Sequence, residues 1–145
     1  MLGELTVEEI ELLLRRESIG RIGCVADSRI YVVPTTYAYD GEFVYSHSAD
    51  GLKIRTMRAN PSVCFEVEQI IDLAHWSSVI AWGRYEELTG ANEDHAIALL
   101  TNRFSPSPIS ATALARPRIR GIAQEGSRTT LFRLRLSEKT GRFER

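Results

Sequence analysis

The chain has 145 residues, with 18 Lys and Arg against 19 Asp and Glu, so its formal net charge is −1. This length fits one domain with a buried core, and the near-neutral charge argues against nonspecific attraction to nucleic acid or to an anionic membrane. The N-terminal residues lack the basic and apolar regions of a signal peptide, and no apolar run approaches the ~20 residues that cross a bilayer. We therefore expect a cytoplasmic protein that binds neither nucleic acid nor membrane.

Three segments have the spacing and end signals of short helices. The predicted helices cover residues 7–17, 52–60 and 92–104. Thr6 and Glu9 have the spacing of a capping box before the first helix, and Gly20 is expected to end it. Pro61 stops the second helix because proline cannot continue the hydrogen-bonded turn. The polar residues 92–94 are expected to cap the third.

The other regular runs are rich in β-branched and aromatic residues and predict strands. The predicted strands cover residues 22–26, 30–39, 43–45, 63–68, 74–88 and 129–136. Tight turns at Asp27–Ser28 and Asp40–Gly41 predict that the first three form an antiparallel meander. Residues 79–83 are expected to pack on both sides, with Gly83 permitting a bulge. The resulting fold class is mainly β (α+β), a small antiparallel β-barrel with short flanking helices.

Two cysteines and one long irregular segment complete this description. Cys24 and Cys64 each lie among apolar residues and are expected to be core thiols on strands. No metal-ligand spacing surrounds either cysteine. Residues 105–126 have no regular pattern, and a loop of that length is often functional or interfacial.

Residues 45–53, YSHSADGLK, form the clearest candidate ligand site. A β run ends in small hydroxyl residues, turns at Gly51 and enters a helix with Lys53 in its first turn. Backbone N–H groups at the helix start, serine hydroxyls and one ammonium can hold a phosphate. The alternative is that Ser48 or Asp50 only caps the helix while Lys53 is solvated. A P-loop and a G-x-G-x-x-G motif are both absent, which argues against a nucleoside triphosphate or a Rossmann-bound dinucleotide.

A second candidate feature is the proline within the strong β run 32–36, VVPTT. Proline removes a donor from the strand ladder, so Pro34 predicts an edge strand, a bulge or a barrel rim. At such a rim the hydroxyls of Thr35 and Thr36 and exposed backbone groups can hydrogen-bond a flat heteroaromatic ring. A plain edge strand is the alternative reading.

Taken in order, these segments resemble the pyridoxamine 5′-phosphate oxidase-like flavoproteins, and most closely their nitroimidazole-resistance (NimA-type) branch. The matching segments are GRIG (20–23), YVVPTTY (31–37), YSHS (45–48), GLK (51–53), NPSVCF (60–65), SVIAWGR (78–84) and TGR (140–142). The resemblance covers nearly the whole chain at suitable spacing. The Arg- and Trp-containing substrate segment of true pyridoxamine-phosphate oxidases has no match in residues 141–145, so the vitamin B6 reaction is not expected.

The resemblance implies that residues 1–145 form a single split β-barrel domain that binds FMN at a homodimer interface. The phosphate would be held by Ser46, His47, Ser48 and Lys53. The isoalloxazine and ribityl chain would be lined by Val33, Pro34, Thr35 and Thr36. The pocket would be completed, from the partner subunit, by Val79, Trp82 and Gly83.

The expected activity is that of an FMN-dependent oxidoreductase. The flavin would accept a hydride from NAD(P)H and pass electrons to a small molecule, such as a nitroaromatic compound or a quinone. No metal and no protein nucleophile is required, and no catalytic residue is assigned. His47 could take part in proton transfer, since the reference pKa of histidine is about 6.5. The alternatives are a non-enzymatic flavin- or haem-binding module and a deazaflavin (F420) reductase. The F420 reading needs a basic groove, which Arg116, Arg118 and Arg120 can supply if they are not simply a solvated loop.

Overall fold

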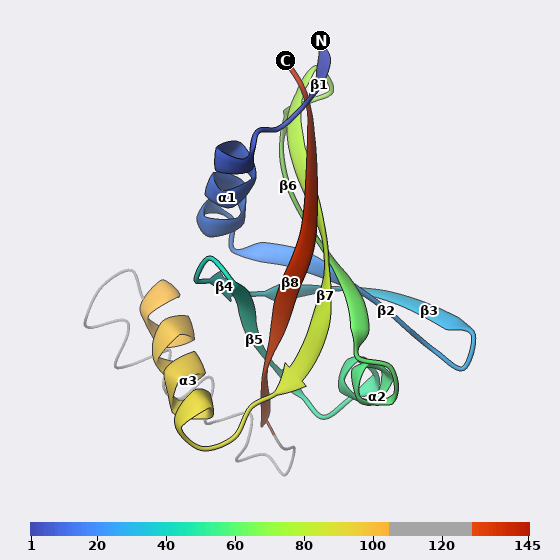
Figure 1. The fold of residues 1–145 in the computed structure, drawn as a ribbon, viewed down its shortest axis with the longest axis vertical. Helices are drawn as coiled ribbons and strands as arrows, with labels where there is room; N and C mark the ends of the chain where they lie inside the picture. The colour runs from blue at the N-terminus through green and yellow to red at the C-terminus, as the bar shows by residue number, and fades with distance from the viewer. Residues whose placement is uncertain (105–128) are drawn as a thin grey trace.

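The computed structural model describes residues 1–104 and 129–145, which form an open antiparallel sheet with three short helices (Figure 1). In chain order the elements are β1 (Leu2–Glu4), α1 (Val7–Arg16), β2 (Ile19–Ala26), β3 (Arg29–Thr36), β4 (Ala38–Tyr39), β5 (Phe43–Ala49), α2 (Leu52–Ala59), β6 (Ser62–Asp72), β7 (His75–Glu87), α3 (Ala91–Arg103) and β8 (Thr129–Glu144). The predicted loop over residues 105–126 and the arginines at 116, 118 and 120 lie outside the described residues.

The sheet has the strand order β3-β2-β6-β7-β8-β5-β4, and β1 pairs with β8 beside this path. Strands β3 and β4 follow each other in the chain but occupy opposite edges, so the sheet curls without closing. The chain crosses between these edges at Tyr37, which is fully buried. Its backbone N–H donates to the Ser18 carbonyl at 3.1 Å and its hydroxyl donates to the Leu14 carbonyl at 2.7 Å. This architecture confirms the predicted mainly β split barrel with flanking helices.

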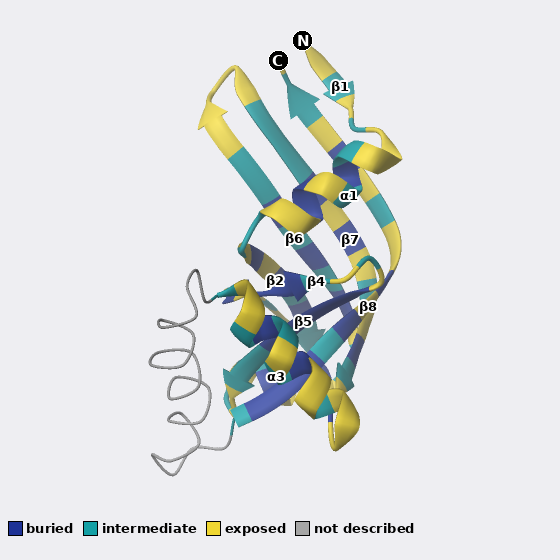
Figure 2. Ribbon diagram, turned by 90° about the vertical axis from the view of Figure 1, so that its left-hand side faces the viewer, coloured by how far each residue is buried: buried dark blue, intermediate teal, exposed yellow. Residues whose placement is uncertain are grey.

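The concave side of the sheet holds the main apolar core. Ile10, Leu13 and Leu14 on α1 and Ile54 and Met57 on α2 bury their side chains there. A smaller apolar cluster lies under α3, around Leu100. Figure 2 shows α1 and α3 lying over one side of the strands. The helices of the described chain therefore cover only part of the sheet surface.

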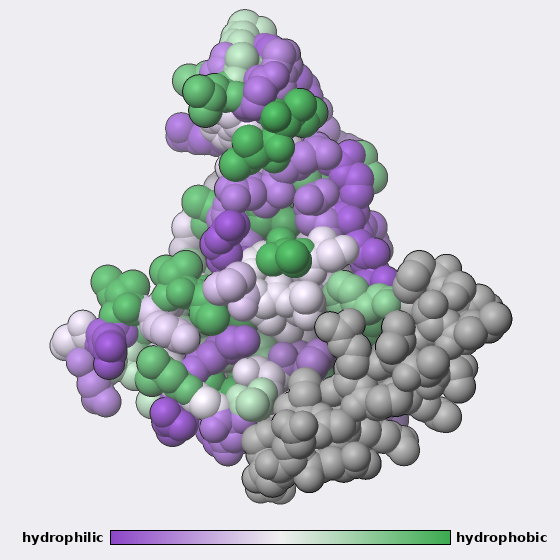
Figure 3. Space-filling model, turned by 180° about the vertical axis from the view of Figure 1, so that it is seen from behind, coloured by the Kyte–Doolittle hydropathy of each residue, from purple (hydrophilic) through white to green (hydrophobic). Residues whose placement is uncertain are grey.

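The opposite, outer face of β3, β2, β6 and β7 carries exposed apolar side chains. The strand register aligns Val32 with Gly23, Gly23 with Cys64, and Cys64 with Trp82. Side chains alternate between faces along each strand, and Val32 and Trp82 are 63% and 42% exposed. Figure 3 shows apolar groups reaching the surface among hydrophilic ones on the back of the molecule. Cys24 is buried as predicted, whereas Cys64 is only half-buried on this outer face.

Most predicted elements are present. The capping box is confirmed: Glu9 N–H donates to Thr6 Oγ1 at 3.2 Å, and Thr6 N–H donates to the Glu9 carboxylate at 2.8 Å. Gly20, predicted to end α1, instead lies within β2, where a Cβ would come within 2.2 Å of the Phe65 ring. The predicted cap of α3 is also wrong, because the helix begins at Ala91 after Gly90 and no side chain caps it.

The strands differ from prediction mainly where the sheet bends. The expected strand over 30–39 is broken at Tyr37, so two hairpins, β2–β3 and β4–β5, replace the predicted meander. The run 79–83 is not packed on both sides, because Trp82 faces outward. The predicted bulge is present: the ladder shifts between Trp82 and Gly83, which pair with Glu138 and Leu136 of β8.

Candidate functional site

The junction between β5 and α2 is the predicted anion site. Helix α2 has Gly51 as its N-cap, with extended backbone and no side-chain capping bond, and its first turn holds no acidic residue. Asp50 bonds Arg58 at 3.0 Å, and Ser48 Oγ donates to the Ala49 carbonyl at 2.9 Å. The alternative reading, in which Ser48 or Asp50 caps the helix, is therefore wrong. The N–H groups at the start of α2 are left for another acceptor.

Lys53, in the first turn of α2, is a half-buried cation. Burial lowers the pKa of its ammonium from the ordinary 10.5, while the neighbouring Cys24 thiol opposes this shift. Burial likewise raises the pKa of Cys24. Among residues 1–104 and 129–145, Lys53 has no hydrogen-bond or ion-pair partner. Since buried charges in proteins are normally paired, this corner of the fold is suited to an external anion.

Ser46, predicted as a phosphate ligand, is fully buried beside the end of β3. Its hydroxyl donates to the Thr36 carbonyl at 2.7 Å and lies 2.7 Å from Thr35 Oγ1. The Thr35 hydroxyl also lies 3.2 Å from the Thr36 carbonyl oxygen, and either hydroxyl can be the donor between Thr35 and Ser46. The structure thus brings Thr35, Thr36 and Ser46 together, with Ser46 engaged inside the fold. His47 and Ser48 follow on β5 and are half-buried.

The remaining predicted residues are divided between the two faces of the sheet. Thr35 is buried and Val33 packs on the core, whereas Pro34 and Thr36 are exposed. Val79 is fully buried in the main core, while Trp82 lies on the outer face. Strands β2 and β6 separate β3 from β7, which places those strands about 14 Å apart at ~4.8 Å per strand. Within one chain, the β7 residues therefore lie away from the β3 residues.

A cavity of about 430 Å³ lies between α2 and the β2–β3 hairpin, and we call it the hairpin cavity. Its lining residues are Ala26, Asp27, Arg29, Tyr31, Leu52, Arg55, Thr56 and Ala59. Tyr31 pairs with Cys24 in the β2–β3 ladder, so the cavity adjoins the region of Lys53. None of its lining residues was predicted from the sequence. The i, i+3, i+4, i+7 spacing of the α2 residues was the available signal, since it places them on one helix face.

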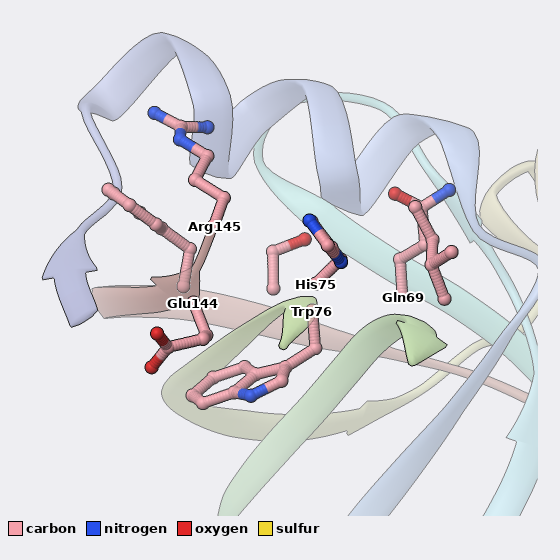
Figure 4. Close-up of a pocket in the computed structure, with 8 residues that line it drawn as sticks. Gln69, His75, Trp76, Glu144 and Arg145 are labelled. Carbon is pink, nitrogen blue, oxygen red and sulfur yellow. The ribbon is translucent and has the colours of Figure 1, made fainter. Parts of the chain in front are cut away.

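A second cleft, of about 220 Å³, lies at the far end of β6, β7 and β8 (Figure 4). Its charged groups are engaged within the fold: Glu144 accepts from the N-terminal amine, Arg145 donates to Glu9, and His75 contacts Asp72. No residue of the predicted ligand set lines it. In the part of the chain that the structure describes, the cleft thus lacks an unpaired charge like that of Lys53 at the β5–α2 junction.

No group of three or more His, Cys, Asp or Glu side chains in residues 1–104 and 129–145 is placed to hold a metal ion. Within the same residues, no helix is both long enough and apolar enough to cross a membrane.

The structure is an open antiparallel sheet with an uncapped helix start and, within the described residues, an unpaired lysine beside its edge. These features define a split β-barrel with a candidate anion site. The sequence matches the family described as pyridoxamine 5′-phosphate oxidase over residues 6–143. Because the match spans nearly the whole chain, the protein belongs to this family.

Three individual proteins are similar to this chain in structure or in sequence. A FAD-binding protein from Mesorhizobium loti is 31% identical, with a TM-score of 0.75 over 100% of this chain and 99% of that one. A candidate 5-nitroimidazole antibiotic resistance protein from Bacteroides thetaiotaomicron is 18% identical and shares the fold, with a TM-score of 0.73 over 99% and 87%. An uncharacterized protein of Rhizobium meliloti strain 1021 is 35% identical over 88 residues, 61% of this chain and 58% of that protein. The chain thus matches less than two thirds of that relative's length.

Proposed function

We infer that this protein binds a flavin, FMN in particular, with the flavin phosphate at the β5–α2 junction. The observation that carries this proposal is Lys53, a half-buried ammonium without an acidic partner in the described residues. A phosphate dianion supplies the missing charge and accepts charge-assisted hydrogen bonds. The family match and the FAD-binding description of the Mesorhizobium loti protein support a flavin as the ligand.

The residues around the junction divide into binding and supporting roles. Lys53, Ser48, His47 and the first N–H groups of α2 are proposed to bind the phosphate. Ser46 is proposed to support the site, because its buried hydroxyl holds the end of β3 against β5. The rest of the flavin would lie along the rim of β3, near Val33, Pro34, Thr35 and Thr36.

We also propose that the protein is a homodimer through the outer sheet face. Val32, Ile80 and Trp82 expose 63%, 41% and 42% of their surface there, and soluble monomers rarely expose large contiguous apolar patches. Of the three β7 residues expected to reach a partner's flavin, Trp82 is the one whose side chain faces outward. Val79 is enclosed in the core, and Gly83 lies against the Arg135 carbonyl.

The proposed reaction is oxidoreduction of a small molecule in the cytoplasm, with NAD(P)H as donor. The flavin supplies the hydride and electron chemistry when it is bound. The chain's own residues bind the flavin, orient it and shape access to it. One alternative is a non-enzymatic module with the same fold, which binds a flavin or a haem without turnover. The other is an F420 reductase, which requires a basic groove; the residues predicted to form that groove lie outside the described ranges.

Purified protein provides the test. The expected result is a yellow protein that releases FMN on denaturation and is bleached anaerobically by NAD(P)H. Replacement of Lys53 by Met is expected to weaken FMN binding by about 1.5–3 kcal/mol, the contribution of hydrogen bonds to charged groups. A colourless protein that takes up no added flavin would contradict the proposal, and a Soret band would identify haem instead. Flavin binding without bleaching would leave a binding module rather than an enzyme.

A further inference from the structure

We propose that the hairpin cavity is a subsite for the nucleoside diphosphate group of a nucleotide, a ligand class beyond the flavin phosphate. The cavity combines four kinds of side chain that can bind the parts of a nucleotide. Two arginines and a carboxylate line it, together with one aromatic ring and several apolar groups. These groups come from the β2–β3 hairpin and from one face of α2, which are separate in the sequence.

The cations of the cavity are available to an external anion. Arg29 and Arg55 have no hydrogen-bond or ion-pair partner within residues 1–104 and 129–145. By contrast, Arg21, Arg58 and Arg133 each donate to a carboxylate at 3.3 Å or less. The planar guanidinium matches the geometry of phosphate oxygens. Two such groups on one cavity are therefore suited to a diphosphate.

The other lining groups match a nucleoside. Asp27 is exposed on the hairpin turn and forms no ion pair with either arginine within 4 Å, so its carboxylate can accept from ribose hydroxyls, as acidic residues do in dinucleotide sites. The half-buried Tyr31 presents a flat ring, and Leu52 an apolar surface, for the base. A pocket with few placed polar groups on an apolar wall is the usual form of a small-molecule site.

The size and the position of the cavity agree with this ligand. Its volume of about 430 Å³ falls within the ~300–1,000 Å³ typical of small-molecule sites, whereas the 220 Å³ cleft does not. Leu52, which precedes Lys53, lines the cavity, so the subsite continues from the proposed flavin-phosphate corner. The nucleoside diphosphate can thus belong to the nicotinamide donor, or to FAD, in which one of the two phosphates is the flavin phosphate at the neighbouring corner.

The test is calorimetric titration of the purified protein with ADP. Wild-type protein is expected to bind ADP, and Arg29→Ala and Arg55→Ala are each expected to weaken it roughly tenfold or more, the effect of losing a charge-assisted bond. Arg15→Ala is the matched control, because Arg15 is an exposed arginine on α1 whose contact is the Tyr39 ring. The proposal is overturned if ADP does not bind, or if the cavity variants lose no more affinity than this control.

Titration of flavin-loaded protein distinguishes the two sources. ADP binding to FMN-loaded but not to FAD-loaded protein identifies the subsite as the place of the FAD nucleotide. ADP binding to both forms identifies a separate donor site. Failure of the proposed flavin function gives a different result, namely wild-type protein that takes up neither FMN nor FAD while still binding ADP.

Discussion

The hydroxyl oxygens of Thr35 and Ser46 lie 2.7 Å apart in the interior, and Ser46 also donates to the Thr36 carbonyl at 2.7 Å. Thr35 lies near the end of β3, at one edge of the sheet, and Ser46 lies on β5 near the other. These two bonds therefore connect parts of the sheet that share no strand ladder. They hold the opening of the barrel next to the proposed phosphate site.

Replacing Ser46 by Ala is expected to lower the free energy of unfolding by about 1–3 kcal/mol. The change removes the two 2.7 Å contacts of the buried Ser46 hydroxyl and leaves the Thr35 hydroxyl with only its longer, 3.2 Å bond to the Thr36 carbonyl. Ser48→Ala is the matched control. Its hydroxyl is only half-buried and bonds the next carbonyl, so this variant should keep its stability and lose flavin affinity. Urea unfolding and FMN titration of both variants measure the difference. Equal stability of the two variants would contradict the structural role of Ser46.

Replacing Lys53 by Met is expected to stabilise the flavin-free protein at neutral pH by a few degrees in Tm, because it removes a half-buried charge that has no ion-pair partner among the described residues. The folded-state pKa of Lys53 lies below the ordinary 10.5. At pH values between these two pKa values, the unfolded chain therefore binds the Lys53 proton more tightly than the folded chain does. Stability of the wild type therefore rises as pH rises between the folded-state pKa and 10.5. The advantage of the variant should accordingly shrink towards pH 10, as thermal unfolding at pH 7 and pH 10 will measure.

The same substitution separates a binding lysine from a merely structural one. With FMN present, the wild type should be more stable than the variant, because ligand binding stabilises the wild type and the variant loses that gain. If Lys53→Met lowered the stability of the flavin-free protein, the lysine would be paired in solution.

Replacing Gly83 by Ala is expected to destabilise the fold by roughly 2 kcal/mol or more, because the added Cβ would lie 2.4 Å from the Arg135 carbonyl oxygen. The clash is with the backbone of β8 at the bulge, so a rotamer change cannot relieve it. Gly51→Ala is the control, since its Cβ would meet its nearest atom at 3.9 Å and its backbone is extended. Denaturant unfolding of the two variants should differ clearly. Equal stabilities would mean that the β7–β8 bulge adjusts freely.

Replacing Val32 by Asp is expected to convert a dimer into a monomer without unfolding it. Val32 is 63% exposed on the outer face, so the folded chain tolerates the charge, whereas an interface would bury it. Leu12→Asp on α1, at a residue 58% exposed on the helical side, is the control and should remain dimeric. Light scattering after size-exclusion chromatography reads out the mass. A wild-type monomer, or a dimer that survives Val32→Asp, would exclude this face as the interface.

The fold was predictable from the sequence where the signals are local. The capping box at Thr6 and the glycine turn at Gly41 each depend on neighbouring residues, and both are present. The break at Tyr37 was not predictable, because the run 30–39 is uniformly β-prone and only packing under α1 interrupts it. Strand β8 continues eight residues beyond Leu136, where the bulge at Ser137 and the exposed sheet end obscure the alternation.

The candidate site was predictable only in part. The residues 45–53 are consecutive in the chain, so Lys53 and its helix start could be found by reading along it. The run 33–36 is also consecutive, but alternation along the strand sends Thr35 inward and Pro34 outward. Arg29 and Arg55 belong to elements that meet only after folding. The helical spacing groups Arg55 with other α2 residues on one face, but it does not show that this face lines a cavity with the β2–β3 hairpin.

The position of β8 has a consequence for synthesis on the ribosome. This strand follows every other described element in the chain, yet it pairs with β7 on one side and with β5 on the other. Until it has been made, the facing edges of β5 and β7 have no partner, and unpaired edges invite aggregation. The nascent chain therefore cannot assemble the sheet in the order in which it emerges. The β3-β2-β6-β7 part can pair earlier, but completion of the sheet must wait for residues 129–144, and we expect the open edges of β5 and β7 to need protection from aggregation until then.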